Sequence, residues 1–331
     1  MRDVASQTFH VQPQQAGLTL SAALRQWLPD TSWSEVRKLL AQRRVLANGN
    51  LTFDETRRVQ QGEVVKVLAE SAPKPPADDD VRLRYLDQHL VIVEKPAGMT
   101  SIRHREEKNW TIRRRQMQPT LEECLPRIIA QKAGKSRRGL PPPVRAVHRL
   151  DRGTSGLMVF ARSIAAERHL GVQFKKHTIH RRYLAVVQGV MAEPMRIESH
   201  LVRDRGDGRR GSTPDKAVGK RAVTHVTPLE KLGEYTLVEC RLETGRTHQI
   251  RIHLGELGLP LCGERVYHQP LGGTARNDAS DAPRIALHAA ELGLIHPATG
   301  ETLSVKMPFP PDLERFVDRL RKKAAKAAGA K

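Results

Sequence analysis

A segment that cannot enter a hydrophobic core divides this chain early in its length. Residues 71–80 run Ser-Ala-Pro-Lys-Pro-Pro-Ala-Asp-Asp-Asp, so clustered prolines are followed at once by an acidic run. Proline cannot donate a backbone hydrogen bond, and adjacent carboxylates repel one another. We therefore predict a linker at 71–80 between a small domain at 1–70 and a larger one that begins at residue 81. A length of 331 residues suits two domains.

Two helices are predicted before the linker. Ser32 and Glu35 have the S-x-x-E spacing of a capping box, which starts a helix. An earlier amphipathic stretch at 18–28 supplies its packing partner. The apolar residues of the second helix fall on one face, at Val36, Leu39 and Leu40. The basic residues near it are expected to lie largely off that face, at Arg37, Lys38 and Arg44.

Short strands follow these helices. Residues 45–51 indicate a strand, a tight Asn-Gly turn and a second strand, and residues 62–68 indicate a closing strand. The Val-x-x-Asn-Gly and Gly-Glu-x-Val patterns, with the two helices, resemble the S4 RNA-binding domain over about residues 16–69. This resemblance implies that Arg37, Lys38 and Arg44 bind RNA. The alternative is that the charged face of the helix is only solvated.

Strands dominate the predictions beyond the linker. They are predicted at 81–86, 90–94, 157–161, 183–188, 235–243 and 303–307. Helical spacing is found mainly at 164–176 and 248–257. Many strands with few helices indicate an α+β domain at 81–318, built on an antiparallel or mixed sheet. The Lys/Ala-rich end at 319–331 is predicted to be a basic tail that forms a fraying helix.

Composition favours a polyanionic partner. Lys and Arg number 56 against 36 Asp and Glu, which gives a net charge of +20 and a pI of about 10.4. Such an excess favours nucleic acid, although some proteins are basic without binding one. Basic residues cluster around Trp110, and those at Arg113, Arg114 and Arg115 are predicted to contact RNA phosphates.

Membrane proteins, disulfide scaffolds and metalloproteins are disfavoured. No run approaches the ~20 apolar residues of a membrane span, and residues 1–12 lack the apolar core of a signal peptide. We therefore expect a cytoplasmic protein without a membrane partner. Cys124, Cys240 and Cys262 are too far apart for a structural zinc site or a disulfide framework, so each is expected to be buried and reduced, with no metal bound.

The most informative motif is Val-His-Arg-Leu-Asp-Arg-Gly-Thr-Ser-Gly at 147–156, which precedes the apolar strand at 157–161. A carboxylate in a polar turn that leads into a buried strand is well placed for function. From these residues alone, Asp151 could equally form a surface ion pair with its arginine neighbours or simply stabilise the turn. The full string His-Arg-Leu-Asp-x-x-Thr-Ser-Gly, however, resembles the signature of the RluA-type pseudouridine synthases.

Further segments extend this resemblance over most of residues 81–310. Residues 85–98 are similar to the family's opening strand pair and its Lys-Pro-x-Gly turn, and Arg182-Tyr183 to its catalytic-domain tyrosine. Residues 244–253, Thr-Gly-Arg-Thr-His-Gln-Ile-Arg-Ile-His, are similar to its later basic motif, and residues 288–292 and 296–300 to its closing strands. The basic stretch after Thr100 departs from the family pattern and leaves the subfamily open.

The resemblance implies an isomerase that needs neither metal nor cofactor. The N1–C1′ bond of a uridine would break, the base would turn within the pocket, and C5 would be joined to C1′. Asp151 is carried over as the catalytic carboxylate, either as a nucleophile at C1′ or as a base that removes the 2′ proton. Tyr183 is carried over as the ring that lies against the base, and Arg251 as the cation that keeps Asp151 ionised, from a buried position on its helix.

The target uridine must leave the RNA stack to reach this carboxylate, and Arg149 is the candidate to fill its place. The combination with an S4-like module favours large-subunit ribosomal RNA as substrate, with tRNA as the alternative, and a monomer is expected. A non-catalytic RNA-binding or ribosome-assembly factor stays open as a second class. A hydrolytic glycosidase is disfavoured, because it needs two carboxylates and the core motif has one.

Overall fold

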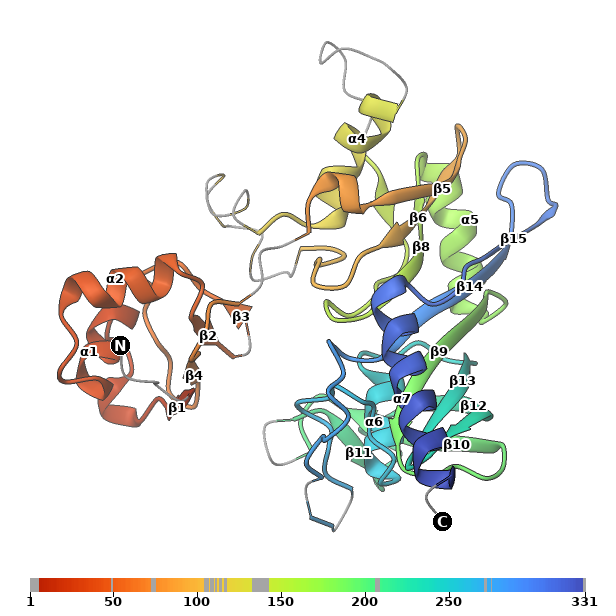
Figure 1. Ribbon diagram of the computed structural model, residues 1–331. Helices are drawn as coiled ribbons and strands as arrows, with labels where there is room; N and C mark the ends of the chain where they lie inside the picture. Colours follow the sequence, from red (N-terminus) through yellow and green to blue (C-terminus); the bar gives the residue numbers. More distant parts are fainter. Residues whose placement is uncertain are drawn as a thin grey trace. The chain divides into compact units, whose positions relative to one another are not determined.

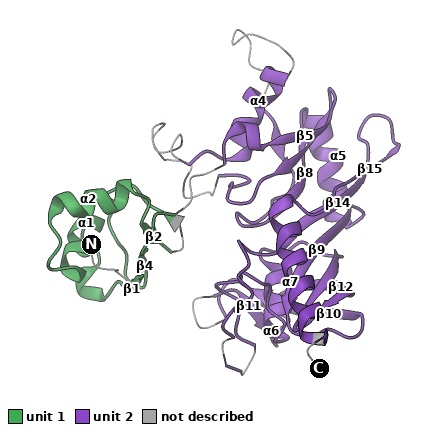
Figure 2. Cartoon of the chain, viewed as in Figure 1, with its two compact units in different colours: residues 1–75, 111–117 green, residues 76–110, 118–331 purple. Residues whose placement is uncertain are grey.

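The computed structural model of this chain describes residues 6–48, 50–72, 76–103, 107, 110, 112, 115, 118–132, 143–205, 209–270, 273–274 and 276–329. The chain forms two compact units, residues 1–75 with 111–117 and residues 76–110 with 118–331 (Figure 2). The acidic half of the predicted linker belongs to the second unit. It forms a 3₁₀ turn, η2 (Asp78–Asp80), in which the Asp78 carboxylate accepts a hydrogen bond from Arg127 Nε at 2.6 Å.

The first unit contains both helices that the sequence predicts. Helix α1 spans Leu20–Trp27, and its N-cap Thr19 accepts a hydrogen bond from a backbone amide through its side chain. Helix α2 spans Trp33–Ala41, and the capping box between Ser32 and Glu35 is formed as expected. These caps satisfy amide groups that a helix start otherwise leaves without partners.

Four antiparallel strands complete the first unit, in the order β1-β4-β2-β3. They are β1 (Gln7–His10), β2 (Val45–Ala47), β3 (Asn50–Leu51) and β4 (Val64–Val67), and a 3₁₀ turn, η1 (Pro13–Gln15), follows β1. The sequence prediction missed β1, because its residues are mostly exposed and lack apolar alternation. The helices and strands enclose one apolar core that includes Leu24, Val36 and Val65.

The second unit is built on one mixed sheet (Figure 1). Its main order is β11-β10-β12-β13-β9-β14-β8-β6-β5, with β15 paired to β14 and β7 to β8. The strands are β5 (Arg82–Leu86), β6 (Leu90–Lys95), β7 (Arg145–Ala146), β8 (Ser155–Ala161), β9 (His180–Gln188), β10 (Met195–Val202), β11 (Gly211–Thr213), β12 (Lys220–Leu232), β13 (Tyr235–Leu242), β14 (Leu287–Ile295) and β15 (Thr302–Lys306). The mixed α+β fold predicted from the sequence is confirmed, although β7, β10, β11 and β12 were not predicted.

Helices cover both faces of this sheet. Helix α4 (Leu121–Lys132) and α6 (Gln249–Glu256) contribute to the apolar cluster on one face, and α5 (Ile164–Lys175) contributes to the cluster on the other. The alternating side chains of β8 are therefore buried on both sides, which explains the uninterrupted apolar run of this strand. The sequence prediction missed α4, which carries Pro126 inside it and so breaks the usual helical pattern.

The C-terminal helix α7 (Pro311–Gly329) is longer than the predicted basic tail and begins before it. It packs on an apolar cluster through side chains that lie three or four residues apart: Leu313, Phe316, Val317 and Leu320. The expected boundary at residue 318 thus falls inside a continuous helix, because this apolar face extends into the tail.

A close backbone approach joins β8 to β14, where the only parallel pairing of the described strands occurs. Gly156 has φ of +121°, and a Cβ atom there would lie 2.3 Å from the backbone oxygen of Ala289. Only glycine fits this position. The Thr-Ser-Gly end of the 147–156 motif is thereby explained as the point at which its loop joins the centre of the sheet.

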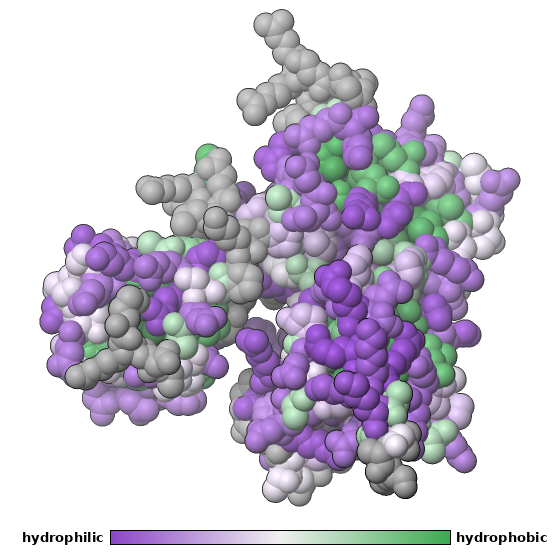
Figure 3. All heavy atoms as spheres, viewed as in Figure 1, coloured by the Kyte–Doolittle hydropathy of each residue, from purple (hydrophilic) through white to green (hydrophobic). Residues whose placement is uncertain are grey.

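The surface agrees with the composition. Hydrophilic residues cover most of the face shown in Figure 3. Within the described part of the chain, no helix has the length and apolar character needed to cross a membrane.

Candidate active site

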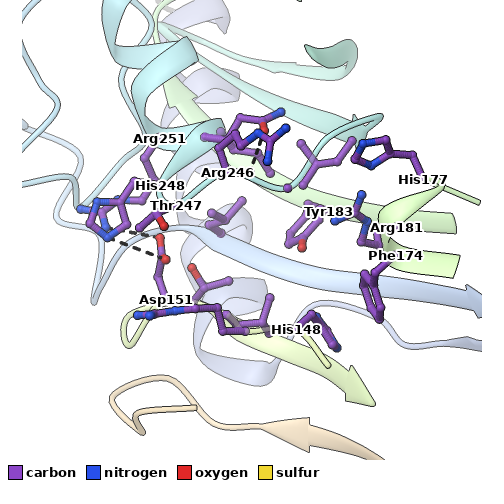
Figure 4. A pocket seen from close by; sticks show the side chains of 18 of the residues that line it. His148, Asp151, Phe174, His177, Arg181, Tyr183, Arg246, Thr247, His248 and Arg251 are labelled. Carbon is purple, nitrogen blue, oxygen red and sulfur yellow. Dashed lines mark hydrogen bonds and ion pairs between the residues drawn. The ribbon is translucent and has the colours of Figure 1, made fainter. Parts of the chain in front are cut away.

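A pocket of about 470 Å³ lies where the loop before β8, the start of β9 and the start of α6 meet (Figure 4). The wall of the pocket shares three residues with the apolar cluster on the α4 and α6 face of the sheet: Tyr183, Ile250 and Leu287. Among the described residues that line it, Asp151 alone is acidic. The pocket therefore combines one carboxylate with several cations and an aromatic ring.

Asp151 faces Arg251 and His248 across this pocket (Figure 4). Arg251 Nη1 donates to Asp151 Oδ2 at 3.4 Å, a long hydrogen bond, and His248 Nε2 lies 3.8 Å from Oδ1. The Asp151 side chain keeps 17% of its surface exposed, so an incoming group can reach the carboxylate.

The loop that carries Asp151 is tied on both sides to the Lys-Pro-Ala-Gly turn. Gly98 N donates to the Arg152 carbonyl at 2.7 Å, and Arg152 Nε donates back to the Gly98 carbonyl at 3.0 Å. Ser101 Oγ donates to the Leu150 carbonyl at 2.7 Å and accepts from the Leu150 amide at 3.1 Å. These four contacts place the carboxylate on a rigid support.

A buried lysine reinforces the same support. Lys95 is fully buried, and its Nζ donates to the carbonyls of Pro96 and Met99, each at 2.9 Å, and of Arg152 at 3.3 Å. Burial lowers the pKa of Lys95 to about 7, and the charge of Asp151 opposes this shift. The Lys-Pro-x-Gly turn thus supplies an internal cross-link to the Asp151 loop.

Arg251 is held mainly by a different carboxylate. Its Nε and Nη2 donate to the two oxygens of Glu264, at 2.7 and 2.9 Å, and the Glu264 side chain is fully buried. Glu264 also accepts from the amides of Arg265 and Val266. Burial raises the pKa of Glu264, but the hydrogen bonds and charge of Arg251, with the amides of Val266 and Tyr267, lower it overall. Arg251 therefore forms its bidentate pair with Glu264, and Asp151 receives the remaining Nη1.

His248 lines this side of the pocket and contacts Tyr267. His248 is the N-cap of α6 and has a left-handed backbone, with φ of +61°. Its Nδ1 lies 2.7 Å from the Tyr267 hydroxyl, and the Arg251 guanidinium lies over the Tyr267 ring at 5.1 Å. Burial lowers the pKa of His248 to about 4, so the ring is neutral at pH 7. The ionised Asp151 carboxylate can only accept hydrogen bonds. The favoured tautomer of His248 therefore carries its proton on Nε2, which faces Asp151, while Nδ1 accepts from the Tyr267 hydroxyl.

Tyr183 lies on β9 between Cys240 of β13 and Ala289 of β14. It is buried but lines the pocket, and Figure 4 shows its ring on the same hollow as Asp151. Burial raises the pKa of its hydroxyl, so the ring is uncharged at pH 7. A flat uncharged ring beside a carboxylate can stack a planar base whose sugar meets Asp151.

The model of the family described as RNA pseudouridylate synthase matches residues 89–256, which span the Asp151 loop, Tyr183 and α6. The chain belongs to this family. The synthase is 35% identical over 320 residues to a Neisseria meningitidis protein named ribosomal large subunit pseudouridine synthase D, covering 93% of this chain and 80% of the relative. A Xanthomonas campestris protein of the same name is 33% identical over 321 residues, covering 95% and 92%.

Solved structures agree on the fold of the synthase. Human RNA pseudouridylate synthase domain containing 4 aligns with a TM-score of 0.57 at 23% identity, covering 72% of this chain and 92% of that structure. The related human domain containing 1 aligns with a TM-score of 0.53 at 22% identity, covering 75% and 98%. Family membership makes this chain an isomerase that converts uridine to pseudouridine in RNA.

The structure brings Asp151, Tyr183 and Arg251 to one pocket, as the family motifs predicted for the synthase. The expected burial of Arg251 on its helix is also found. Arg149 is exposed at the rim, two residues from Asp151. His148 stacks on Phe174, and its Nε2 accepts from the Val159 amide at 3.0 Å.

Apart from Arg149, the predicted RNA-binding residues fall within the sequence of the first unit, 1–75 with 111–117. Arg37 and Lys38 are exposed on α2, off its buried face as predicted, and Arg37 Nε lies 3.4 Å from the carboxylate of Glu55. Arg44 follows α2 and donates to the Leu68 carbonyl at 2.8 Å. Arg113 and Arg114 lie outside the described residues, and Arg115 is partly buried.

Sequence reasoning assigned no role to Glu264, Tyr267, Lys95 or Arg181. The first two lie in the segment Cys-Gly-Glu-Arg-Val-Tyr at 262–267, which has no periodic pattern and was not singled out. Glu264 follows a mostly apolar segment and a glycine in the sequence, and this pattern could have indicated a buried carboxylate that needs a cationic partner. For Lys95 the family pattern indicates only a turn, although a lysine that ends the apolar strand β6 can indicate a buried cation.

Proposed function

We propose that this synthase isomerises uridine in large-subunit ribosomal RNA, with Asp151 as the catalytic carboxylate. The observation that carries the proposal is the single partly exposed carboxylate of the pocket, within 3.4 Å of a buried arginine and on the same hollow as Tyr183. The ribosomal target is supported by two relatives named for the ribosomal large subunit, whose similarity extends over 93% and 95% of this chain.

Asp151 would act at the ribose. As a nucleophile its carboxylate would attack C1′ and release the base with its electron pair; as a base it would remove the 2′ proton while the N1–C1′ bond breaks. In either route Arg251 Nη1, which donates to Asp151 Oδ2 at 3.4 Å, would be the cationic partner of the carboxylate. The uracil then turns in the pocket and C5 bonds to C1′, which releases the Asp151 carboxylate in the first route or is accompanied by return of the 2′ proton in the second. C5 then loses its proton to water, and N1 takes one up.

Tyr183 and Arg149 are proposed to manage the flipped base. Tyr183 would stack on the uracil while it turns, because an aromatic face holds a base without fixing its orientation through hydrogen bonds. Arg149 stands at the exposed rim beside the Asp151 loop, where it can occupy the place that the uridine leaves in the RNA stack.

The first unit is proposed to be an S4-like RNA-binding module. Its two capped helices and short strands follow the pattern that suggested this module, and Arg37 and Lys38 are exposed on α2. Arg44, with Arg113 to Arg115, would add phosphate contacts. A monomer located in the cytoplasm, where bacterial ribosomes are assembled, accords with this proposal.

Release of tritium from RNA that carries 5-tritiated uridine tests the proposed function, because joining C5 to C1′ displaces the C5 hydrogen. We expect release from large-subunit ribosomal RNA and a loss of about 10²–10⁴-fold in the Asp151→Asn variant. Asp215→Asn is the matched control, since Asp215 is exposed in a turn between β11 and β12. Release from tRNA alone would identify tRNA, and not ribosomal RNA, as the substrate. Absence of release from every RNA pool would refute the proposed activity.

A further inference from the structure

Arg181 lines the active-site pocket at a place that the isomerisation does not use. It lies two residues before Tyr183 on β9, so both side chains leave the same face of the strand. Figure 4 shows Arg181 beside Phe174 and Tyr183, away from Asp151. Its neighbour Arg182 leaves the opposite face and forms an ion pair with Glu239.

Three lysine or arginine residues are buried among those that the structure describes: Lys95, Arg181 and Arg251. Lys95 donates to three carbonyls, and Arg251 donates to both oxygens of Glu264. Among contacts with the described residues, Arg181 makes one hydrogen bond, from Nη2 to the Glu243 carbonyl at 3.5 Å, and its buried Nε has no partner there. Arg181 is therefore the least satisfied of the three.

Packing alone does not account for this burial. The guanidinium lies over the Phe174 ring at 5.7 Å, and one long carbonyl contact offsets little of the cost of removing a charge from water. Burial lowers the pKa of Arg181, with no carboxylate among the causes that oppose it. For Arg251 burial acts in the same direction, but Glu264 raises the pKa overall. Arg181 thus lacks a compensating acceptor, and its side chain borders an open pocket.

The surroundings of Arg181 favour an anion as the missing partner. Three further residues with basic side chains line the same pocket and are exposed: Lys175, His177 and Arg246. No ion pair joins Arg181 to a carboxylate of the described chain, and Asp151 is already engaged by Arg251. A planar guanidinium with several basic neighbours suits the oxygens of a phosphate.

The loop before α6 leaves space for this guanidinium. Gly245 lies in the Thr-Gly-Arg-Thr-His motif, and a Cβ atom there would lie 2.6 Å from Arg181 Nη1. Any side chain at this position would displace the Arg181 head group. The motif at 244–253, which supplies Arg251 to the Asp151 site, therefore also leaves the space that the Arg181 guanidinium occupies.

We propose that Arg181 binds a backbone phosphate of the RNA at the target uridine, with Lys175 and Arg246 as exposed contributors. This inference rests on the proposed function, since it takes RNA as the occupant of the pocket. The phosphate completes the hydrogen bonding of Arg181 and holds the flipped nucleotide between two anchors, Asp151 at the ribose and Arg181 at the backbone. An empty pocket leaves Arg181 buried and unsatisfied.

Binding of a short fluorescein-labelled oligouridylate to the full chain, measured by anisotropy over a range of NaCl concentrations, provides the first test. Arg181→Gln is expected to weaken binding about tenfold or more and to reduce the salt slope by about 0.7, the value for one single-strand phosphate contact. Arg181→Lys should retain most of the slope. The matched control is Arg182→Gln, which removes an equal charge from the other face of β9 and should change neither quantity.

The second test uses an RNA that the wild-type protein modifies, with a neutral methylphosphonate at each phosphate that flanks the target uridine. One neutral linkage should weaken binding to the wild type but not to Arg181→Gln, because the contact is already absent in that variant. Equal losses of binding affinity in both proteins at every linkage would overturn the proposal and indicate that Arg181 contacts the base instead of a phosphate. Unchanged oligouridylate binding and salt slope in Arg181→Gln would overturn it as well.

The two proposals fail in different ways. If no RNA releases tritium but the Arg181→Gln variant still shows the reduced salt slope, the phosphate site stands and the proposed function fails. If wild-type protein releases tritium while Arg181→Gln binds and reacts as Arg182→Gln does, the proposed function stands and the phosphate site fails. Gly245→Ala should reproduce the weaker binding of Arg181→Gln, since its Cβ atom displaces the guanidinium.

Discussion

Glu264 binds the guanidinium of Arg251 through both carboxylate oxygens, at 2.7 and 2.9 Å, and so fixes the cation that faces Asp151. The pair is almost entirely buried, with 9% and 0% of the two side chains exposed. A buried ion pair is costly to break, because the remaining charge loses its partner in a place that water cannot reach. The position of the Arg251 guanidinium therefore depends on Glu264, which lies outside the family motifs.

Replacing Glu264 by Gln should harm stability and activity together. Breaking a buried pair costs about 3–5 kcal/mol, and the amide cannot compensate the Arg251 charge. We expect a comparable loss in the free energy of unfolding, measured with urea, and a fall in kcat of about tenfold or more as Arg251 shifts toward Asp151. The matched control is Glu230→Gln, which breaks an exposed pair with Arg321 and should cost about 1 kcal/mol or less. Equal losses in the two variants would contradict the importance of Glu264.

Lys95 should make stability depend on pH in the alkaline range. Its pKa is about 7 in the folded protein and about 10.4 in the unfolded chain. Between these values the unfolded chain binds more protons, so the free energy of unfolding rises with pH, by about 2 kcal/mol between pH 7 and about pH 9. The Lys95 contribution is complete only above the unfolded pKa and is lost as the pH falls through 7.

Urea unfolding of the wild type and of Lys95→Met at the two pH values isolates this effect, because other titrating groups contribute to both proteins. The difference between the two free energies should change by about 2 kcal/mol over this range. A difference that does not vary with pH would mean that Lys95 keeps an ordinary pKa in the folded protein.

Gly156→Ala should prevent the normal pairing of β8 with β14. The added Cβ would lie 2.3 Å from the Ala289 oxygen, and φ of +121° is strained for alanine. We expect a loss of more than about 4 kcal/mol, or no folded protein, by thermal unfolding. Gly171→Ala is the opposite case, since Gly171 lies in α5 with open space around it, and should stabilise by up to about 1 kcal/mol. A stable Gly156→Ala protein with full activity would refute the close approach.

Tyr183 should act through its ring. If the ring stacks on the uracil, Tyr183→Phe keeps most of the activity, whereas Tyr183→Leu loses the stacking that contributes about 1–3 kcal/mol per base. The ratio of kcat/KM for the two variants, from tritium release, is expected to reach about tenfold or more. Tyr235→Phe and Tyr235→Leu are the matched pair outside the pocket. Similar activity in Tyr183→Phe and Tyr183→Leu would rule out stacking as its role.

Local patterns were predicted well where they depend on near neighbours. The Ser32 and Glu35 capping box, the strand after the 147–156 motif and the helix at 164–176 were all found, because each is formed by residues close in sequence. Helix α4 was missed, because Pro126 interrupts its pattern although tertiary packing keeps it helical. The edge strand β1 was missed because it needs no apolar alternation.

The sequence by itself determined the family, the α+β class and the pocket motifs, since these are carried by short strings of residues and by periodicity. Only the tertiary structure decided that Arg251 binds Glu264, that Lys95 supports the Asp151 loop and that Arg181 is buried without a carboxylate. The physical reason is distance along the chain. Arg251 is 13 residues from Glu264 and 100 from Asp151, and the order of strands in the sheet brings them together. Which acceptor a buried cation obtains depends on that packing, which no local pattern specifies.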